Sequence, residues 1–390
     1  MKMLTSSILL VAVVAAPALS LHPPAFSQSV IDSGSALKTL NSLALLEAHT
    51  KFGPGCNPLK LKIRQEWRRI SKPRRRKFIA AVKCIQAKPS ILPPNQVPAS
   101  MTLYDDLAWA HALRTGLVHN SGWFLPFHRY YIYAYEKALG ECGWDAGLPY
   151  WEWALDVNGP HLSPLFDGSD TSLGSDGVFI SNRTASVLQP PGFNSTTIIN
   201  PGTGGGCIRE GPFSDLVIRL GPYAFNGSFA PLPDSQQAAN PRCVTRDLNA
   251  QPIQMWNTFR AVTRQILDYD NIQDFAGNLD GDSRVANEPG RVHGGGHIGI
   301  GGTARDVRLS PYEPAFWLHH ANVDRVWWVW QHLDFETRRG VWATRTWFNI
   351  PPTDNATVED YLEIEPHAPP RKIRELMNSV GGSPLCYVYV

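Results

Sequence analysis

The stretch SPYEPAFWLHHANVDRVWWVWQHL, residues 310–333, decides the fold. Pro311 and Pro314 open it, and proline suits the first turn of a helix. No Gly or Pro follows before residue 333, so the pattern predicts a helix over 314–332. Its many tryptophans indicate an aromatic-rich core. His320 and Asp324 lie one turn apart on the same face of this helix, which therefore carries both core and candidate site.

Further helices are predicted on either side of this segment. Apolar spacing indicates helices over 103–118, from Pro126 to about Gly140, and over 253–270, and two short helices within 58–85 around Pro73. Residues 158–250 are rich in Gly, Pro, Asn and Ser, and the glycine run 202–206 is interpreted as loop. The predicted fold is mainly α, with long irregular loops and few short strands.

Composition narrows the class of protein. The chain has 390 residues, of which 43% are hydrophobic and 18% charged, so it can bury a sizeable core and is not disordered overall. The formal net charge of +2 argues against a partner such as nucleic acid. No apolar stretch reaches the length of a membrane span, and no membrane partner is expected.

Twelve histidines are present, and six of them form two groups. In the first group, two antiparallel helices joined by a short connection would bring together His111, His119 and His128. In the second, His293 and His297 are an i, i+4 pair on one helical face, and His320 completes the set. The intervening glycines 294–296 argue against a helix here, since each costs up to about 1 kcal/mol relative to Ala.

Two sets of three imidazoles indicate two metal ions. Neutral imidazole binds both copper and zinc. A hydrolytic zinc site of the HExxH type adds a glutamate, and the segment HGGGH has none. Two coppers that face each other, bind dioxygen and transfer two electrons suit the pattern better. A zinc hydrolase is the alternative, and any single histidine taken alone is more often an ordinary core residue.

Three segments together resemble the tyrosinase / catechol oxidase (polyphenol oxidase) family: HNSGWFLPFHR (119–129), LPYWEW (148–153) and SPYEPAFWLHHANVDR (310–325). The resemblance spans about residues 50–390. It implies a four-helix bundle around a type 3 dicopper centre. It assigns copper A to His111, His119 and His128 and copper B to His293, His297 and His320, and it leaves His319 outside the ligand set. Phe124, Phe316 and Trp317 are candidates for packing around the site.

The sequence departs from the family pattern at several positions. Many members have a Cys thioether partner where Leu117 stands, so no thioether is expected; Glu152 and Glu313 replace aspartates. Gly294 stands where many tyrosinases have an Asn that, with a nearby Glu, orients a water. Glu288 is the candidate for that Glu. Ile298 and Val307 are candidates for the wall of the substrate pocket.

The resemblance implies oxidation of o-diphenols to o-quinones with dioxygen. Because Gly294 has no side chain to bind water, monophenol hydroxylation is expected to be weak. An o-aminophenol oxidase or a true tyrosinase using the same site are alternatives. A hemocyanin-like oxygen carrier is the alternative from another functional class.

A predicted signal peptide, four glycosylation sequons and six cysteines together indicate secretion. Residues 1–20 have a charged start, an apolar run and a small-residue cleavage site, typical of a signal peptide. Residues 21–50 are a propeptide or an N-terminal arm, and residues 51–390 form the catalytic domain. Four sequons could carry N-glycans, at Asn182, Asn194, Asn226 and Asn355. The chain ends shortly after Tyr387-Val-Tyr389, from which a short form without a C-terminal lid is expected.

Six cysteines without a CxxC spacing indicate disulfides rather than a zinc site. The pairing expected from the sequence is Cys56–Cys84, Cys207–Cys243 and Cys142–Cys386. Only the first has a local argument, because Cys56 and Cys84 bracket the segment predicted as two helices.

Overall fold

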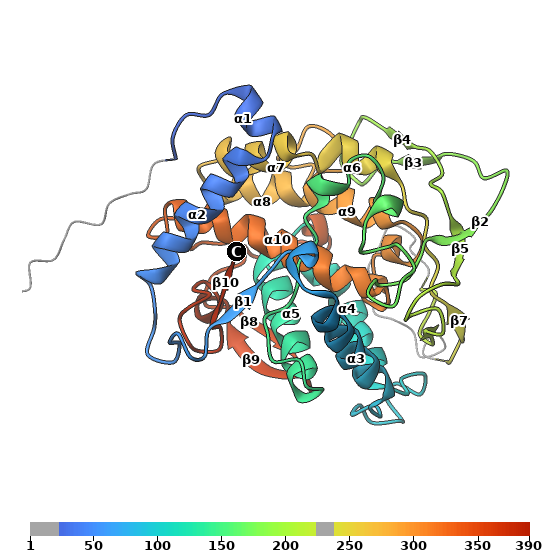
Figure 1. Ribbon diagram of the computed structural model, residues 1–390. Helices are drawn as coiled ribbons and strands as arrows, with labels where there is room; N and C mark the ends of the chain where they lie inside the picture. Colours follow the sequence, from blue (N-terminus) through green and yellow to red (C-terminus); the bar gives the residue numbers. More distant parts are fainter. Residues whose placement is uncertain (1–22, 224–237) are drawn as a thin grey trace, which may run out of the picture.

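Helix α10 (Pro314–Leu333) runs through the middle of the computed structural model, which describes residues 23–223 and 238–390 (Figure 1). All 20 of its residues are buried. Pro314 occupies the first turn, and the Glu313 carboxylate accepts a hydrogen bond from the Ala315 backbone N–H, which caps the helix. A helix that is buried on every side is stable only inside a larger core, and here the rest of the fold is built around it.

Helices α5 (Phe124–Glu141) and α9 (Val292–Ile300) pack on α10, and α4 (Leu103–Val118) packs on α5 and completes a four-helix bundle. The mainly helical fold with a bundle at its centre is therefore confirmed. Helix α4 begins at a capping box formed by Thr102 and Asp105. It ends at His119, and Asn120 takes a positive φ of 42° that turns the chain toward α5.

Two helix predictions were wrong in detail. The segment 253–270 is two helices, α6 (Ala250–Trp256) and α7 (Phe259–Leu267), because the Thr258 side chain accepts from the Ala261 N–H and starts a new helix. The segment 58–85 contains one α-helix, α3 (Lys72–Ala87), preceded by a short strand and a 3-10 turn at Trp67–Arg69. Helix α8 (Ile272–Asp280) was not predicted.

The strands are short and pair two by two. The first strand, β1 (Lys62–Arg64), runs parallel to β10 (Tyr387–Tyr389), with Lys62 opposite Tyr387. The remaining pairs are antiparallel: β2 (Gly177–Phe179) with β5 (Gly205–Ile208), β3 (Ser186–Leu188) with β4 (Thr197–Ile199), β6 (Val217–Ile218) with β7 (Arg242–Cys243), and β8 (Tyr361–Ile364) with β9 (Ala368–Lys372). Few short strands are thus confirmed, although the glycine run 202–206 is partly strand.

The N-terminal segment is folded against the bundle. Helices α1 (Gln28–Asp32) and α2 (Ser35–His49) lie beside α10 and α7 (Figure 1). The buried Asn41 side chain donates to the Tyr389 carbonyl at 3.1 Å and accepts from Arg325 Nε at 2.8 Å. Residues 28–49 are therefore part of the core packing.

Asp324 connects the two ends of the chain beneath the bundle. Its buried carboxylate accepts from Arg129 Nε at 2.6 Å and from Arg64 Nη1 at 3.2 Å. The hydroxyls of Tyr387 and Tyr389 each donate to it at 2.6 Å. Although burial favours protonation, the two guanidinium groups hold the pKa of Asp324 below its ordinary value.

The disulfides correct the expected pairing. Cys207–Cys243 is confirmed, but the other bonds are Cys56–Cys386 and Cys84–Cys142. Helix α3 packs on α5, which brings Cys84 to Cys142 at the end of α5, and the β1–β10 pairing brings Cys56 to Cys386. These contacts join segments distant in sequence, so local spacing could not reveal them.

Three of the four predicted glycosylation sites lie on the surface of the described residues. Asn182, Asn194 and Asn355 are exposed, whereas Asn226 and the expected signal peptide, residues 1–20, lie outside the described residues. Among the helices of the described ranges, none has the length and apolar character that crossing a bilayer requires.

Candidate metal centre

The first histidine cluster lies where α4 and α5 meet. His111 is on α4, His119 ends that helix, and His128 is on α5. All three are buried, and their ring centroids are 5.1 to 5.6 Å apart. The positive φ of Asn120 makes the turn that sets His119 beside the other two. The structure therefore brings this predicted set together.

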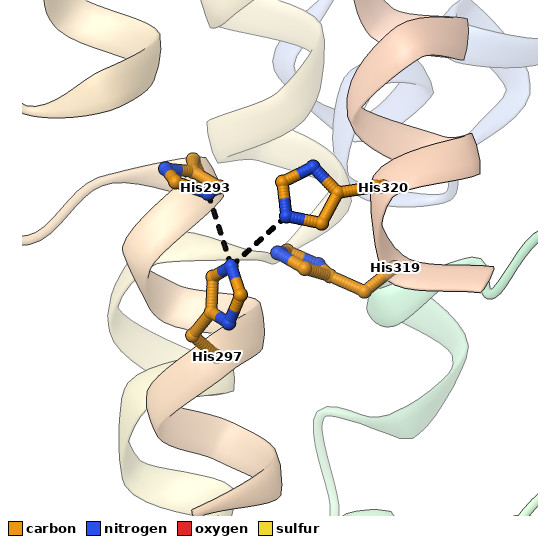
Figure 2. A group of neighbouring side chains, drawn as sticks. All are labelled: His293, His297, His319 and His320. Atoms are coloured by element: carbon orange, nitrogen blue, oxygen red, sulfur yellow. Dashed lines mark hydrogen bonds between the residues drawn. The ribbon is translucent and has the colours of Figure 1, made fainter. Parts of the chain in front are cut away.

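The second cluster lies between α9 and α10. His293 and His297 project from one face of α9 toward His320 on α10 (Figure 2). The Nε2 atom of His297 is 3.0 Å from His293 Nε2 and 3.1 Å from His320 Nε2. Three imidazole nitrogens thus converge on one point, although the sequence alone left it open whether the glycine-rich segment is helical.

Backbone oxygens fix the orientation of the first cluster. The Nδ1 atom lies 2.9 Å from the Arg308 carbonyl in His111, 3.0 Å from the Thr115 carbonyl in His119, and 2.8 Å from the Phe124 carbonyl in His128. A carbonyl can only accept, so each Nδ1 carries the proton and each Nε2 keeps its lone pair. The Nε2 atoms of His111 and His128 are buried without a hydrogen-bond partner.

Two rings of the second cluster are held by a hydrogen bond at Nδ1, whereas Nδ1 of His320 is buried without a partner among the described residues. His297 Nδ1 lies 2.8 Å from the Ala304 carbonyl, and His293 Nδ1 lies 2.8 Å from Asp280 Oδ1. When Asp280 is ionised, it accepts from Nδ1 of His293, and the short Nε2–Nε2 contact between the two rings then joins two lone pairs, which repel unless a cation binds both. Orphaned, converging Nε2 atoms with protonated Nδ1 atoms are the donor set that a metal requires.

The histidines of both clusters are neutral at physiological pH. Burial lowers the pKa of each of the six, to about 4 for His119 and about 3 for His293. Metal binding requires the neutral imidazole, so the surroundings keep all six rings in the ligating form.

The two clusters face each other across the bundle. The rings of His128 and His320 stack with centroids 4.3 Å apart, and those of His119 and His293 are nearly parallel at 6.2 Å. Phe124 packs on His293 at 4.7 Å and Phe316 on His320 at 4.3 Å, so two of the three expected aromatic neighbours contact the clusters. Trp317 instead stacks on Tyr135 at 3.8 Å. The arrangement suits two metal ions held close together.

His319 lies beside the second cluster, but its hydrogen bond sets it apart. Trp153 Nε1 donates to His319 Nδ1 at 3.1 Å. An indole N–H only donates, so the neutral His319 ring carries its proton on Nε2. One ring nitrogen of His319 lies within 4.8 Å of the donor nitrogens of His293, His297 and His320. A protonated Nε2 has no lone pair to offer a metal, so His319 is not a ligand in this tautomer. This tautomer supports the choice of His320 over His319.

The glycine run on α9 is helical because two of its members permit close packing. A Cβ on Gly295 would lie 2.0 Å from Asn257 Oδ1, and one on Gly296 would lie 2.2 Å from His319 Nδ1. The segments that carry Asn257 and His319 therefore approach α9 more closely than a side chain at Gly295 or Gly296 would allow. Gly294 meets nothing within 4 Å and faces open space.

Asp280 links the two clusters and was missed by the sequence reasoning. Its Oδ1 binds His293 Nδ1, and its Oδ2 accepts from the Asn120 backbone N–H at 2.6 Å, next to His119. Burial raises the pKa of Asp280 to about 7. It ends helix α8, which was itself not predicted, so no pattern pointed to it.

A cleft of about 410 Å³ opens above the histidines. Gly294, Ile298 and Val307 line it, as does Asp280, together with His119, His293 and His297. Glu288 is exposed and is not among the described residues that line the cleft, so the structure does not place it at the site. The acidic residue found there is Asp280.

No thioether partner is available at Leu117. All six cysteines are paired in the three disulfides, and none is free. His119 is therefore positioned by the turn after α4 and by its bond to the Thr115 carbonyl.

Comparisons with known proteins agree with this geometry. Residues 101–333 match the family model described as the common central domain of tyrosinase. The chain is 42% identical over 334 residues to tyrosinase P of Aspergillus terreus, which covers 84% of this chain and 91% of that protein. It is 34% identical over 374 residues to the N-acetyl-6-hydroxytryptophan oxidase of Emericella nidulans, covering 90% and 99% of the two chains.

A solved structure is similar over nearly the whole length. It is a glycine-to-asparagine mutant of the polyphenol oxidase from Thermothelomyces thermophila, with a TM-score of 0.78 and 32% sequence identity. The match covers 93% of this chain and 97% of that one.

Proposed function

The chain belongs to the tyrosinase family of type 3 copper oxidases, and from this premise we propose that it oxidises o-diphenols to o-quinones with dioxygen. In this proposal His111, His119 and His128 hold one copper, and His293, His297 and His320 hold the other. The observation that carries it is the convergence of six buried imidazoles, five of which have Nδ1 engaged in a hydrogen bond. The Nε2 atoms of His111 and His128 have no partner in the part of the chain that the structure describes, and His297 Nε2 contacts those of His293 and His320.

The reaction balances without another reactant. Two o-diphenols each lose two electrons and two protons, and one dioxygen takes up all four of each to give two waters. A bound copper pair supplies dioxygen binding and the two-electron exchange. The chain's own residues orient five of the six rings through hydrogen bonds at Nδ1, and Phe124 and Phe316 pack on the clusters and exclude water. The cleft beside Ile298 and Val307 admits the phenol ring.

We propose that hydroxylation of monophenols is weak. Gly294 lines the cleft and carries no side chain that could hold a water near the substrate. An asparagine fits sterically, because a Cβ here meets nothing within 4 Å. The Gly294→Asn variant should gain monophenolase activity relative to its diphenolase activity. An unchanged ratio would show that this position does not limit hydroxylation.

The experiment that tests the function is dioxygen uptake by the copper-loaded protein with catechol, phenol and o-aminophenol side by side. We expect rapid uptake with catechol, slow uptake with phenol, and formation of one quinone per half dioxygen. Faster uptake with o-aminophenol would make the chain an aminophenol oxidase. Reversible oxygen binding without turnover would favour a hemocyanin-like carrier, and bound zinc without uptake would refute the assignment.

We also propose that the protein is secreted. The sequence of residues 1–20, the three disulfides and the exposed Asn182, Asn194 and Asn355 support this. Expression of the full chain in a eukaryotic host should place the protein in the medium, with a mass that falls on enzymatic removal of N-glycans. Retention inside the cell, unglycosylated, would contradict the proposal.

We propose that α2 remains in the mature enzyme as an arm of residues 21–50. Its Asn41 bridges Arg325 and the Tyr389 carbonyl in the core. Mass spectrometry of the secreted protein should find residues 35–49 attached to the catalytic domain, residues 51–390.

A further inference from the structure

We propose that the cleft selects o-diphenols that carry a carboxylate on an apolar arm, and that the Arg305 guanidinium binds this carboxylate. The inference rests on the proposed oxidase function and adds the class of substrate. It derives from the distribution of charge and apolar surface in the cleft.

The titratable groups of the cleft are few, and only Arg305 is neither a proposed metal ligand nor bonded to one. Three histidines belong to the clusters, and both oxygens of Asp280 accept hydrogen bonds. Arg305 also lines the cleft, and its Nη2 donates to the hydroxyl of Ser186 at 3.2 Å. The structure gives it no carboxylate within ion-pair distance in residues 23–223 and 238–390. Asp247, the acidic group that acts on it, is paired with Arg183.

The position of Arg305 is tied to the second histidine cluster. Arg305 ends the 3-10 turn Gly302–Arg305, and the carbonyl of the preceding Ala304 binds His297 Nδ1 at 2.8 Å. Its backbone therefore cannot shift without moving a proposed copper ligand. A phenol ring bound above His297 would therefore share the cleft with Arg305, which lies on its wall.

Apart from Asn120, Gln189 and Ser310, the rest of the cleft lining is apolar, and the cleft is larger than one catechol ring requires. Its outer wall comes from β3 and the turn after it: Val187, Leu188, Pro190 and Pro191. A volume of about 410 Å³ lies in the range of sites that enclose drug-sized ligands. The apolar wall suits a hydrocarbon arm between ring and charge. A guanidinium with free N–H groups binds carboxylate in a two-point geometry.

The test compares matched substrates and one charge-changing variant. 3-(3,4-Dihydroxyphenyl)propanoate and its methyl ester share the ring and the arm and differ in charge. We expect kcat/KM to favour the acid in the wild-type enzyme, and the ratio of acid to ester to fall about tenfold in Arg305→Gln, mainly through KM for the acid. The control Arg76→Gln removes an exposed charge on α3 and should leave the ratio unchanged.

A binding measurement separates this inference from the oxidase proposal. Calorimetry with 3-phenylpropanoate and 3-phenylpropanamide, neither of which can be oxidised, should show tighter binding of the acid, lost in Arg305→Gln and weakened by salt. The inference is overturned if the acid-to-ester ratio of kcat/KM is at or below one, or if Arg305→Gln does not change that ratio. Dioxygen uptake with both substrates would in that case still support the oxidase proposal. Absence of uptake with either substrate, with the acid still bound preferentially, refutes the oxidase alone.

Discussion

The Gly296→Ala substitution tests whether close packing explains the glycine run on α9. The added Cβ would lie 2.2 Å from His319 Nδ1 and 3.1 Å from Trp153 Nε1, so it must break the Trp153–His319 hydrogen bond. Leaving buried polar groups unpaired costs about 1–3 kcal/mol, and overpacking costs about 1–3 kcal/mol more. Alanine returns up to about 1 kcal/mol through helix propensity. We therefore expect a net loss of about 2–4 kcal/mol.

The matched control is Gly294→Ala, two residues earlier on the same helix. A Cβ at Gly294 meets nothing within 4 Å, so the helix-propensity gain of up to about 1 kcal/mol should stand alone. Thermal melts followed by tryptophan fluorescence should show Gly296→Ala about 3–5 °C below wild type, and Gly294→Ala at or above it. Equal melting temperatures for the two variants would refute the packing argument.

Three further perturbations have defined outcomes. Asp280→Ala removes the acceptor of His293 Nδ1 and should weaken copper binding about 10–100-fold in a chelator competition; unchanged affinity would show that Asp280 does not orient the ring. Asp324→Asn removes the buried carboxylate that Arg64 and Arg129 share, although Arg64 keeps its ion pair with Glu136, and should cost about 3–5 kcal/mol in urea unfolding. Because the folded-state pKa of Asp324 is below its unfolded value near 3.9, wild-type stability should fall as pH drops through the folded value, and Asp324→Asn should lose that part of the pH dependence. Replacing Cys56 and Cys386 by serine opens a loop of 330 residues and should lower stability by about 5 kcal/mol, whereas a change below about 1 kcal/mol would mean that the β1–β10 pairing alone closes the chain.

The site histidines could be predicted because their signal is local. His111, His119 and His128 lie within eighteen residues of sequence, and His293 and His297 lie one helical turn apart. Patterns this short can be recognised in the sequence without knowledge of the tertiary packing. The helices carrying His111, His128 and His320 were likewise visible from proline positions and apolar spacing, whereas α9, which carries His293 and His297, was not.

What could not be predicted depends on contacts between distant segments. Asp280 and Arg305 reach the cleft only because α8 and the turn after α9 fold against the bundle, and neither lies in a recognisable motif. The Cys56–Cys386 bond follows from a parallel strand pair that joins the two ends of the chain. The helix through Gly295 and Gly296 contradicts local propensity, and it is stable because Asn257 and His319 pack where side chains would otherwise be.

The central claim is that six imidazoles bind two coppers, and copper stoichiometry tests it most directly. After copper loading and removal of loosely bound metal, elemental analysis should find two coppers per wild-type chain. His297→Ala removes one ligand of the second cluster, whose Nε2 lies 3.0 Å from that of His293, and should leave one copper per chain in the first. Fewer than one copper in the wild-type chain, or the same content in both proteins, would contradict the assignment.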